Sequence, residues 1–338
     1  MKKKKILTDA IDFIKQNDLS EKDDDLHCAV ISFTICQYLC IRYAGIKDIS
    51  LGDVALATGD GYAFTYCPQN PYILYSCFTN FGRRRLLLTG CSFDHQNNKQ
   101  NPEKDWNHLV KGINSGQLVQ INGPEEGIIF GYKDADDIND RKIYFISKWG
   151  PNLNGIVSWE SFKKLVQNNG MGIQFFKEYN ASLRATPYDI IKQILPVIVD
   201  WQENHPGKSE CFGLKALQQF IADLLNPSIP AKYNEIYNCH PFIYQEAARY
   251  WQGQFFFSLA DRVNDNIIKH ELMEVGKAYH NASEEMRKFR INNIWQEWDN
   301  QPKREKIVKY LEAAYDQEKH AIDKLTKITT INPIRSDK

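Results

Sequence analysis

Patterns that define several common classes of protein are missing from this sequence. None of the eight cysteines forms a C-x-x-C pair, so zinc-ribbon and dithiol redox proteins find little support. The chain has no H-E-x-x-H motif, and its eight histidines are scattered rather than clustered with cysteines. We therefore expect neither a metal ion nor another cofactor.

The sequence also lacks long apolar runs and an excess of charge of one sign. No apolar stretch reaches the roughly 18 residues of a membrane span, and the lysine run from Lys2 to Lys5 lacks the apolar core of a signal peptide. Lysine and arginine number 42 together, as do aspartate and glutamate, so the formal net charge is zero. This balance gives no sign of the excess positive charge that nucleic-acid-binding proteins usually carry. We expect a soluble cytoplasmic protein with free thiols that binds no membrane and no nucleic acid.

The residues that are present suffice for a sizeable core and indicate two domains. The 338 residues are 43% hydrophobic and 12% aromatic, and strand patterns almost vanish after Thr186. One helix followed by several antiparallel strands is typical of the α+β class. We predict an α+β domain over residues 1–180, with a central helix packed on an antiparallel sheet, and an all-α domain over residues 181–338.

The expected elements follow from periodicity and from turn residues. Helices of the first domain are predicted at residues 6–16, 28–44, 51–57 and 106–115, with a helix start near 158. Strands are predicted at residues 86–88, 117–121, 127–132, 141–147 and 172–176. The Arg83 to Arg85 triplet is interpreted as a solvated turn before the first of these strands.

A candidate nucleophile stands at the start of the long buried helix. A run of acids leads into the His27–Cys28 pair, after which apolar residues recur at three- and four-residue steps until Gly45. A cysteine in the first turn of a helix feels the positive helix end and unpaired N–H groups, both of which favour the thiolate. The alternative is a small buried hydrophobe, the interpretation that we also give to Cys36 and Cys40.

A second motif, G-D-G followed by alternating aromatic residues, extends from Gly59 to Tyr66. It predicts a tight turn that enters a strand. The glycines would let backbone N–H groups face a ligand, because a residue without Cβ permits close approach. The alternative is an ordinary turn, which the spacing alone favours.

Together these motifs resemble the family of the butirosin-biosynthesis H protein, over most of the chain. The N-terminal domain of that family belongs to the papain-like, C39-peptidase-like cysteine enzymes. His27–Cys28 is similar to its opening motif, the segment from Gly45 to Gly52 to the one that follows, and Gly59 to Tyr66 to its G-x-G-x-x-F-x-Y element. The segment from Phe212 to Leu217 looks like part of its helical C-terminal domain.

The resemblance implies acyl transfer through a cysteine thioester, as in antibiotic biosynthesis, or the related hydrolysis of an amide or thioester. In the best-known member of the family, the acyl chain passes from a carrier protein to an aminoglycoside amine. For this chain we accordingly expect an amine or acyl substrate and an acyl carrier protein as partner; a homodimer is one assembly that the sequence allows. The resemblance makes Cys28 the catalytic residue and places substrate beside His27, Gly59, Asp60, Gly61, Phe64, Tyr66 and Glu126.

The sequence departs from the family pattern at two catalytic positions. The family His before a strand ending in Gly-Tyr is missing from Asn122 to Tyr132, and the family Asp before proline is missing from Lys148 to Pro151. Without acid-base help, thioester chemistry slows by about 10²–10⁴-fold. Glu126, His95 and His108 are the candidates for the vacant role. A degenerate member that only binds a ligand or partner is therefore the second hypothesis, and a carrier-docking surface on the helical domain a third.

Overall fold

A computed structural model of the chain describes residues 4–17, 32–59, 65–66, 81–97, 101–121, 127–147, 155–167, 172–203, 211–226, 239–291 and 301–330. The contacts between these residues divide them into two units. Unit 1 contains the described residues up to Val54 and from Thr89 to Ser182, and unit 2 contains those from Ala55 to Leu88 and from Leu183 onward. Whereas the sequence predicts one division between residues 180 and 181, the contacts group residues 55–88 with the later helices.

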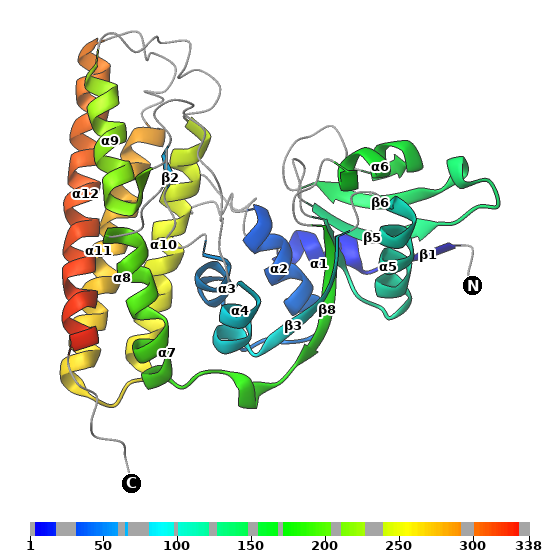
Figure 1. Cartoon of the computed structure of the whole chain (residues 1–338), viewed down its shortest axis with the longest axis horizontal. Helices are drawn as coiled ribbons and strands as arrows, with labels where there is room; N and C mark the ends of the chain where they lie inside the picture. The colour runs from blue at the N-terminus through cyan, green and yellow to red at the C-terminus, as the bar shows by residue number, and fades with distance from the viewer. Residues whose placement is uncertain are drawn as a thin grey trace. The chain divides into compact units, whose positions relative to one another are not determined.

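The described residues of unit 1 form an antiparallel sheet of seven strands (Figure 1). Six of them follow the order β3-β8-β4-β5-β6-β7, and β1 pairs with residues 131–133 of β5, further along that strand than residues 127–129, which pair with β4. The mixed α+β class and the predicted strands near residues 117, 127, 141 and 172 are thus confirmed. The strand bounds are β1 Lys4–Ile6, β3 Cys91–Gln96, β4 Val119–Ile121, β5 Gly127–Lys133, β6 Lys142–Ser147, β7 Gly155–Ser158 and β8 Ile173–Tyr179.

Helices cover both faces of this sheet. On one face lies α5 (Pro102–Asn114), whose Gly112 packs so closely that a Cβ there would meet the side chains of Phe175 and Val119 at 2.7 and 2.8 Å. α6 (Trp159–Gln167) packs beside α5 through edge-to-face aromatic contacts. α2 (Ser32–Tyr43) lies on the other face. Gln120 follows Val119 on β4, so its side chain points away from α5, and it donates a hydrogen bond to the Phe33 carbonyl oxygen of α2. α1 (Ala10–Asn17) packs on α2, where the rings of Phe13 and Tyr43 lie 5.1 Å apart.

In the described parts of unit 2, the regular structure is helical apart from one short strand pair, β2 (Thr65–Tyr66) with β9 (Cys211–Phe212). Its helices are α4 (Phe81–Thr89), α7 (Pro187–Gln193), α8 (Leu195–Glu203), α9 (Gly213–Leu225), α10 (Cys239–Asp261), α11 (Asn266–Ile291) and α12 (Gln301–Thr330). α3 (Leu51–Thr58) spans the division between the units, and its Leu56 and Ala57 join Leu88 in the hydrophobic core formed by the long helices. This shared core is why the early segment belongs to the helical unit.

The prediction of a strand at residues 86–88 is wrong, because the segment is part of helix α4. Three successive leucines cannot distinguish a buried strand from a buried helix, and leucine and arginine both favour helix. The solvated turn predicted for the arginine triplet is wrong for the same reason. Arg84 and Arg85 lie in this helix with only 7% of their surface exposed.

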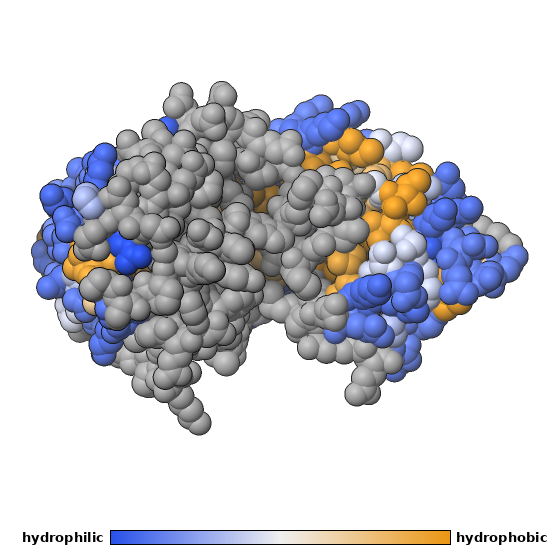
Figure 2. Space-filling view, turned by 90° about the horizontal axis from the view of Figure 1, so that it is seen from above, coloured by the Kyte–Doolittle hydropathy of each residue, from blue (hydrophilic) through white to orange (hydrophobic). Residues whose placement is uncertain are grey.

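On the described surface that Figure 2 shows, hydrophilic side chains cover much of each unit, and hydrophobic side chains form smaller areas among them. Among the described helices, none is both long enough and apolar enough to cross a membrane. The compartment in which the protein works stays a prediction.

Candidate functional site

The buried helix that the sequence predicts behind Cys28 is α2, and its contacts fix its direction on the sheet. Near its beginning, the Phe33 carbonyl accepts a hydrogen bond from Gln120 Nε2 at 3.1 Å, and two turns later the Cys40 thiol lies 3.7 Å from the Leu118 carbonyl oxygen. The earlier helix residue, Phe33, contacts the later strand residue, Gln120, and the later helix residue, Cys40, contacts the earlier residue Leu118. α2 therefore runs antiparallel to β4. The first described turn of α2 therefore lies toward the carboxyl end of β4.

Five strands end or begin together at that place. The strand register aligns Gln96, Ile173, Ile121, Gly127 and Ser147 in one row across β3, β8, β4, β5 and β6. We call this row the Gly127 edge. The row requires glycine on β5, because a Cβ at residue 127 would lie 2.4 Å from both the Ile146 carbonyl oxygen and the ring of Phe145. Strand ends that converge beside the start of a buried helix are a usual place for functional side chains.

Chain continuity links this edge to the residues that the sequence singles out. Glu126 directly precedes Gly127, Lys148 directly follows Ser147, and Cys28 stands four residues before the described start of α2. Cys28, Glu126 and Lys148 themselves lie outside the described residues.

A row of polar side chains crosses the α2 face of the sheet one residue inside the Gly127 edge. His95, Gln174 and Gln120 are direct cross-strand neighbours on β3, β8 and β4. Gln174 Nε2 donates to Gln120 Oε1 at 3.0 Å, and Gln120 Nε2 donates in turn to the Phe33 carbonyl oxygen. Both glutamines are nearly fully buried. A buried amide chain of this kind is costly unless it is satisfied, so it fixes the start of α2 against the sheet.

One further amide on α2 has no hydrogen-bond partner among the described residues. Gln37 follows Phe33 by one helical turn and is fully buried, yet neither its Nε2 nor its Oε1 is paired within the described part of the chain. Buried amides are nearly always satisfied in folded proteins. The interior under the start of α2 is therefore unusually polar for a helix–sheet contact.

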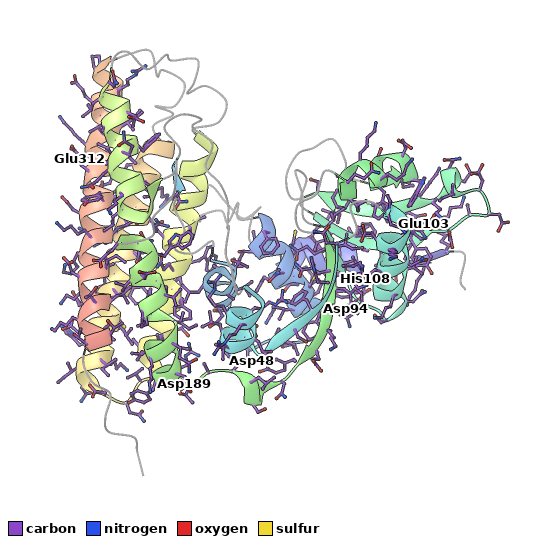
Figure 3. The ribbon with its side chains drawn as sticks, in the orientation of Figure 1. Asp48, Asp94, Glu103, His108, Asp189 and Glu312 are labelled. Atoms are coloured by element: carbon purple, nitrogen blue, oxygen red, sulfur yellow. The ribbon has the colours of Figure 1, made fainter. Side chains whose placement is uncertain are left out.

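The two candidate histidines of unit 1 lie on opposite faces of the sheet. Successive side chains of a strand alternate between faces, so His95 and Asp94 point to opposite sides. Asp94 faces α5, where Lys111 Nζ lies 2.6 Å from its carboxylate and His108 Nε2 lies 3.1 Å from its carbonyl oxygen (Figure 3). His95 is therefore on the α2 face, and its side chain is exposed.

His108 belongs to a different environment. Its ring lies against Phe175, with centroids 4.8 Å apart, and burial lowers the pKa of its imidazole below the ordinary value. The hydrogen bond from Lys111 lowers the pKa of the Asp94 carboxyl. These groups secure α5 to the edge strand and stand apart from α2, so only His95 remains as a described imidazole on the α2 face.

Two residues predicted to bind substrate are described, and both are in unit 2 or at its boundary. Gly59 follows α3 with φ +87°, and its N–H donates to the carbonyl oxygens of Ala55 and Leu56, so it caps the helix. Tyr66 pairs with Cys211 in the small sheet of unit 2. The other predicted residues, His27, Cys28, Asp60, Gly61, Phe64 and Glu126, lie outside the described residues, and their roles stay predictions.

The described cysteine side chains suit structural roles. Cys36, Cys40 and Cys91 are fully buried free thiols, as predicted for the first two. Burial raises the pKa of the Cys40 thiol far above its ordinary value, so this group stays protonated and unreactive. Within the described ranges, no group of His, Cys, Asp and Glu side chains is arranged to hold a metal ion.

Sequence reasoning missed two members of this site, Gln120 and Gln174, which it treated only as residues of predicted strands. It named His95 as a candidate without placing it on a strand, although β3 extends through Gln96. The alternation of C-S-F-D-H-Q was the available signal for β3, whereas pairing between the two glutamines requires knowledge of the strand order. Comparisons with models of known protein families and with curated protein sequences find no match.

Proposed function

We propose that the protein is a cysteine-dependent acyl-transfer or hydrolytic enzyme of papain-like type, acting on an amide or thioester, with Cys28 as nucleophile. The observation that carries this proposal is the convergence at the Gly127 edge. The start of the buried helix that follows Cys28, the strand ends flanking Glu126 and Lys148, and the imidazole-bearing α2 face meet there. A helix whose first turn packs against an antiparallel sheet is the arrangement that the family resemblance leads us to expect.

The reaction takes two covalent steps. The Cys28 thiolate attacks the acyl carbonyl carbon, a C–S bond forms, and the carbonyl electron pair moves to oxygen, where helix N–H groups stabilise it. Collapse of this intermediate breaks the bond to the leaving amine or thiol, which takes up a proton. Water or an acceptor amine then attacks the thioester and gives up a proton, which balances the proton taken up by the leaving group, and the C–S bond breaks to regenerate the thiolate.

The first test measures the acidity of the Cys28 thiol. We expect iodoacetamide to label Cys28 with an apparent pKa clearly below the ordinary value of about 8.5. Tryptic cleavage after Lys22 and Arg42 places Cys28, Cys36 and Cys40 in one peptide, and fragmentation assigns the label. The buried thiols of Cys36 and Cys40 serve as internal controls, because they should stay unlabelled until the protein unfolds.

Turnover supplies the second readout. The wild-type protein should hydrolyse a simple acyl thioester faster than the Cys28→Ser variant and should accumulate an acyl adduct on Cys28 that mass spectrometry detects. An apparent thiol pKa near 8.5, together with equal hydrolysis by wild type and variant, would contradict the enzymatic function.

The second candidate function is a catalytically degenerate papain-like protein that binds a ligand or partner. One observation favours it: the sequences adjoining the Gly127 edge, Asn122 to Glu126 and Lys148 to Pro151, contain neither the His nor the Asp of the family pattern. In that case Cys28→Ser would bind the same small amines or acyl carrier protein as wild type, and no acyl adduct would form on Cys28.

A further inference from the structure

We propose that one face of the unit 1 sheet binds an acidic amphipathic helix of a partner protein. This face lies at the end of β5 opposite the Gly127 edge, and it carries two parallel rows of side chains. The first, the lysine row, consists of Lys4, Lys133 and Lys142. The second, the apolar row, consists of Ile6, Tyr144 and Ile156. The inference does not depend on the chemistry proposed for Cys28.

The lysine row crosses three neighbouring strands. The strand register pairs Lys133 of β5 with Lys4 of β1 and with Lys142 of β6, and all three side chains are exposed. Within the described part of the chain, no carboxylate forms an ion pair with any of them. Like charges directly opposite each other on a sheet are destabilising. An anionic partner would therefore stabilise this row.

The apolar row lies beside the lysine row, two residues away along each strand. The register pairs Gly131 with both Ile6 and Tyr144, and it pairs Tyr144 with Ile156. Ile156 leaves 62% of its surface exposed, and Ile6 and Tyr144 are partly exposed. Lys4 Nζ lies 5.8 Å from the centre of the Tyr144 ring, so the two rows adjoin. Adjoining cationic and exposed apolar side chains are typical of a surface that binds another molecule.

Both rows lie on the face of the sheet that points away from α5. The side chains that alternate with them along β1 and β5 reach α5 instead. Lys5 Nζ donates to the Asn114 carbonyl oxygen at 3.0 Å, and the Tyr132 hydroxyl donates to Asn114 Oδ1 at 3.0 Å. Successive side chains of a strand point to opposite faces, so the residues on either side of Lys5 and Tyr132 point away from α5.

The acidic turn between β5 and β6 bends toward α5 and α6, away from the lysine row. Its short helix η1 (Ile138–Asp140) packs against α6. Asp134 accepts a hydrogen bond of 2.8 Å from Arg141, whose guanidinium lies over the rings of Trp106 and Trp159 on α5 and α6. The turn therefore does not cover the three lysines.

The spacing of the two rows matches an α-helix that lies across the strands. Neighbouring strands are about 4.8 Å apart, so the lysine row spans about 10 Å. A helix rises about 5.4 Å per turn, so carboxylates at positions i, i+4 and i+7 span about 10.5 Å and can each lie over one lysine. The two rows are about 7 Å apart, which is less than the helix diameter of about 10 Å. One helix can therefore place an acidic flank on the lysine row and an apolar flank on the apolar row.

Other occupants match this face less well. An extended segment added to β7, the last strand of the described order, would reach Ile156 but would leave Lys4 three strands away. An anionic membrane surface would meet three lysines, fewer than the roughly four to eight basic residues of typical lipid-binding clusters. The acidic helix is the occupant that uses both rows.

The test uses a stapled helical peptide as the probe. The peptide carries glutamate at positions i, i+4 and i+7 and leucine at the position after each glutamate, and a control peptide has glutamine in place of glutamate. In fluorescence anisotropy, the wild-type full chain should bind the glutamate peptide saturably and the glutamine peptide about tenfold more weakly. Binding of the glutamate peptide should weaken as the salt concentration rises.

A charge reversal tests the lysine row. Lys133→Glu should lower the affinity for the glutamate peptide by about tenfold, because it replaces an attraction with a repulsion. It should not lower the melting temperature, because a glutamate between Lys4 and Lys142 forms favourable cross-strand pairs. Lys319→Glu reverses an exposed lysine of unit 2, and it should bind the peptide as wild type does.

A truncation tests the apolar row without changing the charge. Ile156→Ala should lower the affinity for the glutamate peptide by about fivefold, because less apolar surface is buried on binding. The matched control is Ile267→Ala, which truncates an isoleucine of α11 in unit 2 that is 65% exposed. This control should bind the peptide as wild type does.

Several outcomes would overturn the proposal. They are equal affinity for the glutamate and glutamine peptides, equal losses in Lys133→Glu and Lys319→Glu, and no saturable binding of the peptide by wild type. Binding to phosphatidylserine vesicles in place of the peptide would also overturn it and would assign the face to lipid. Cys28→Ser should bind the glutamate peptide as wild type does, so failure of the proposed enzymatic function leaves this test intact.

Discussion

At the scale of single residues, the most informative feature is the pair of buried glutamines. Their residue type gives no hint of partnership, because a glutamine on a strand is usually a solvated side chain. The structure shows instead that strand order brings Gln120 and Gln174 together under α2. Strand pairing also shows that His95 of β3 and His108 of α5 lie on opposite faces of the sheet. The sequence could not show this, because it did not predict the strand β3.

The glutamine pair supports a prediction about stability. Gln120→Leu removes both the acceptor for Gln174 Nε2 and the donor to the Phe33 carbonyl, so we expect the free energy of unfolding to fall by about 1–3 kcal/mol. The double variant Gln120→Leu with Gln174→Leu should lose less than the sum of the two single variants, because it leaves no amide unpaired within the pair. Urea unfolding of the four proteins checks this, and strict additivity would contradict the coupling.

At the scale of elements, the sequence predicts long periodic segments well and short apolar ones poorly. The helix α5 and the strands β4 to β6 agree with the periodicity and the turn residues. The segment at α4 does not, because three leucines carry no period. The sequence also could not predict which helices of unit 2 pair with one another. Arg249 of α10 and Glu318 of α12 form two hydrogen bonds of 2.8 Å, and both side chains are fully buried.

This buried ion pair gives a prediction about how α10 and α12 are joined. Arg249→Met leaves the Glu318 carboxylate buried without its cation, so we expect a loss of about 3–5 kcal/mol in the free energy of unfolding. The double variant Arg249→Met with Glu318→Leu should recover much of that loss, because neither charge remains. Chemical unfolding monitored by circular dichroism measures both, and a double variant as unstable as the single one would count against this account.

At the scale of the whole molecule, the chain does not divide into two consecutive halves. The change of composition near residue 180 is real, and the contacts change at Ser182 as well. Composition could not show that residues 55–88 join the later helices, because their pairing partners are at least 98 residues away in the sequence. Those partners are β9, which pairs with β2, and the backbone N–H of Ala185, which donates to the Leu87 carbonyl at 2.7 Å.

This connectivity predicts how the protein behaves when it is cut. Fragments 1–182 and 183–338, produced together, should co-elute on size exclusion, because Leu56, Ala57 and Leu88 from the first fragment complete the core of the second. Replacing residues 55–88 of the first fragment by a short flexible linker should abolish the association. If the linker version still binds the second fragment, residues 55–88 are not what joins the two.

The early position of residues 55–88 also has a consequence during synthesis. This segment leaves the ribosome well before α12 at residues 301–330, with which it shares a core. At translation rates of about 5–20 residues per second, the delay amounts to roughly 10–50 s. During that interval unit 1 can close around its sheet while Leu56, Ala57 and Leu88 wait in the nascent chain without their partners, which makes this stretch a natural target for chaperones.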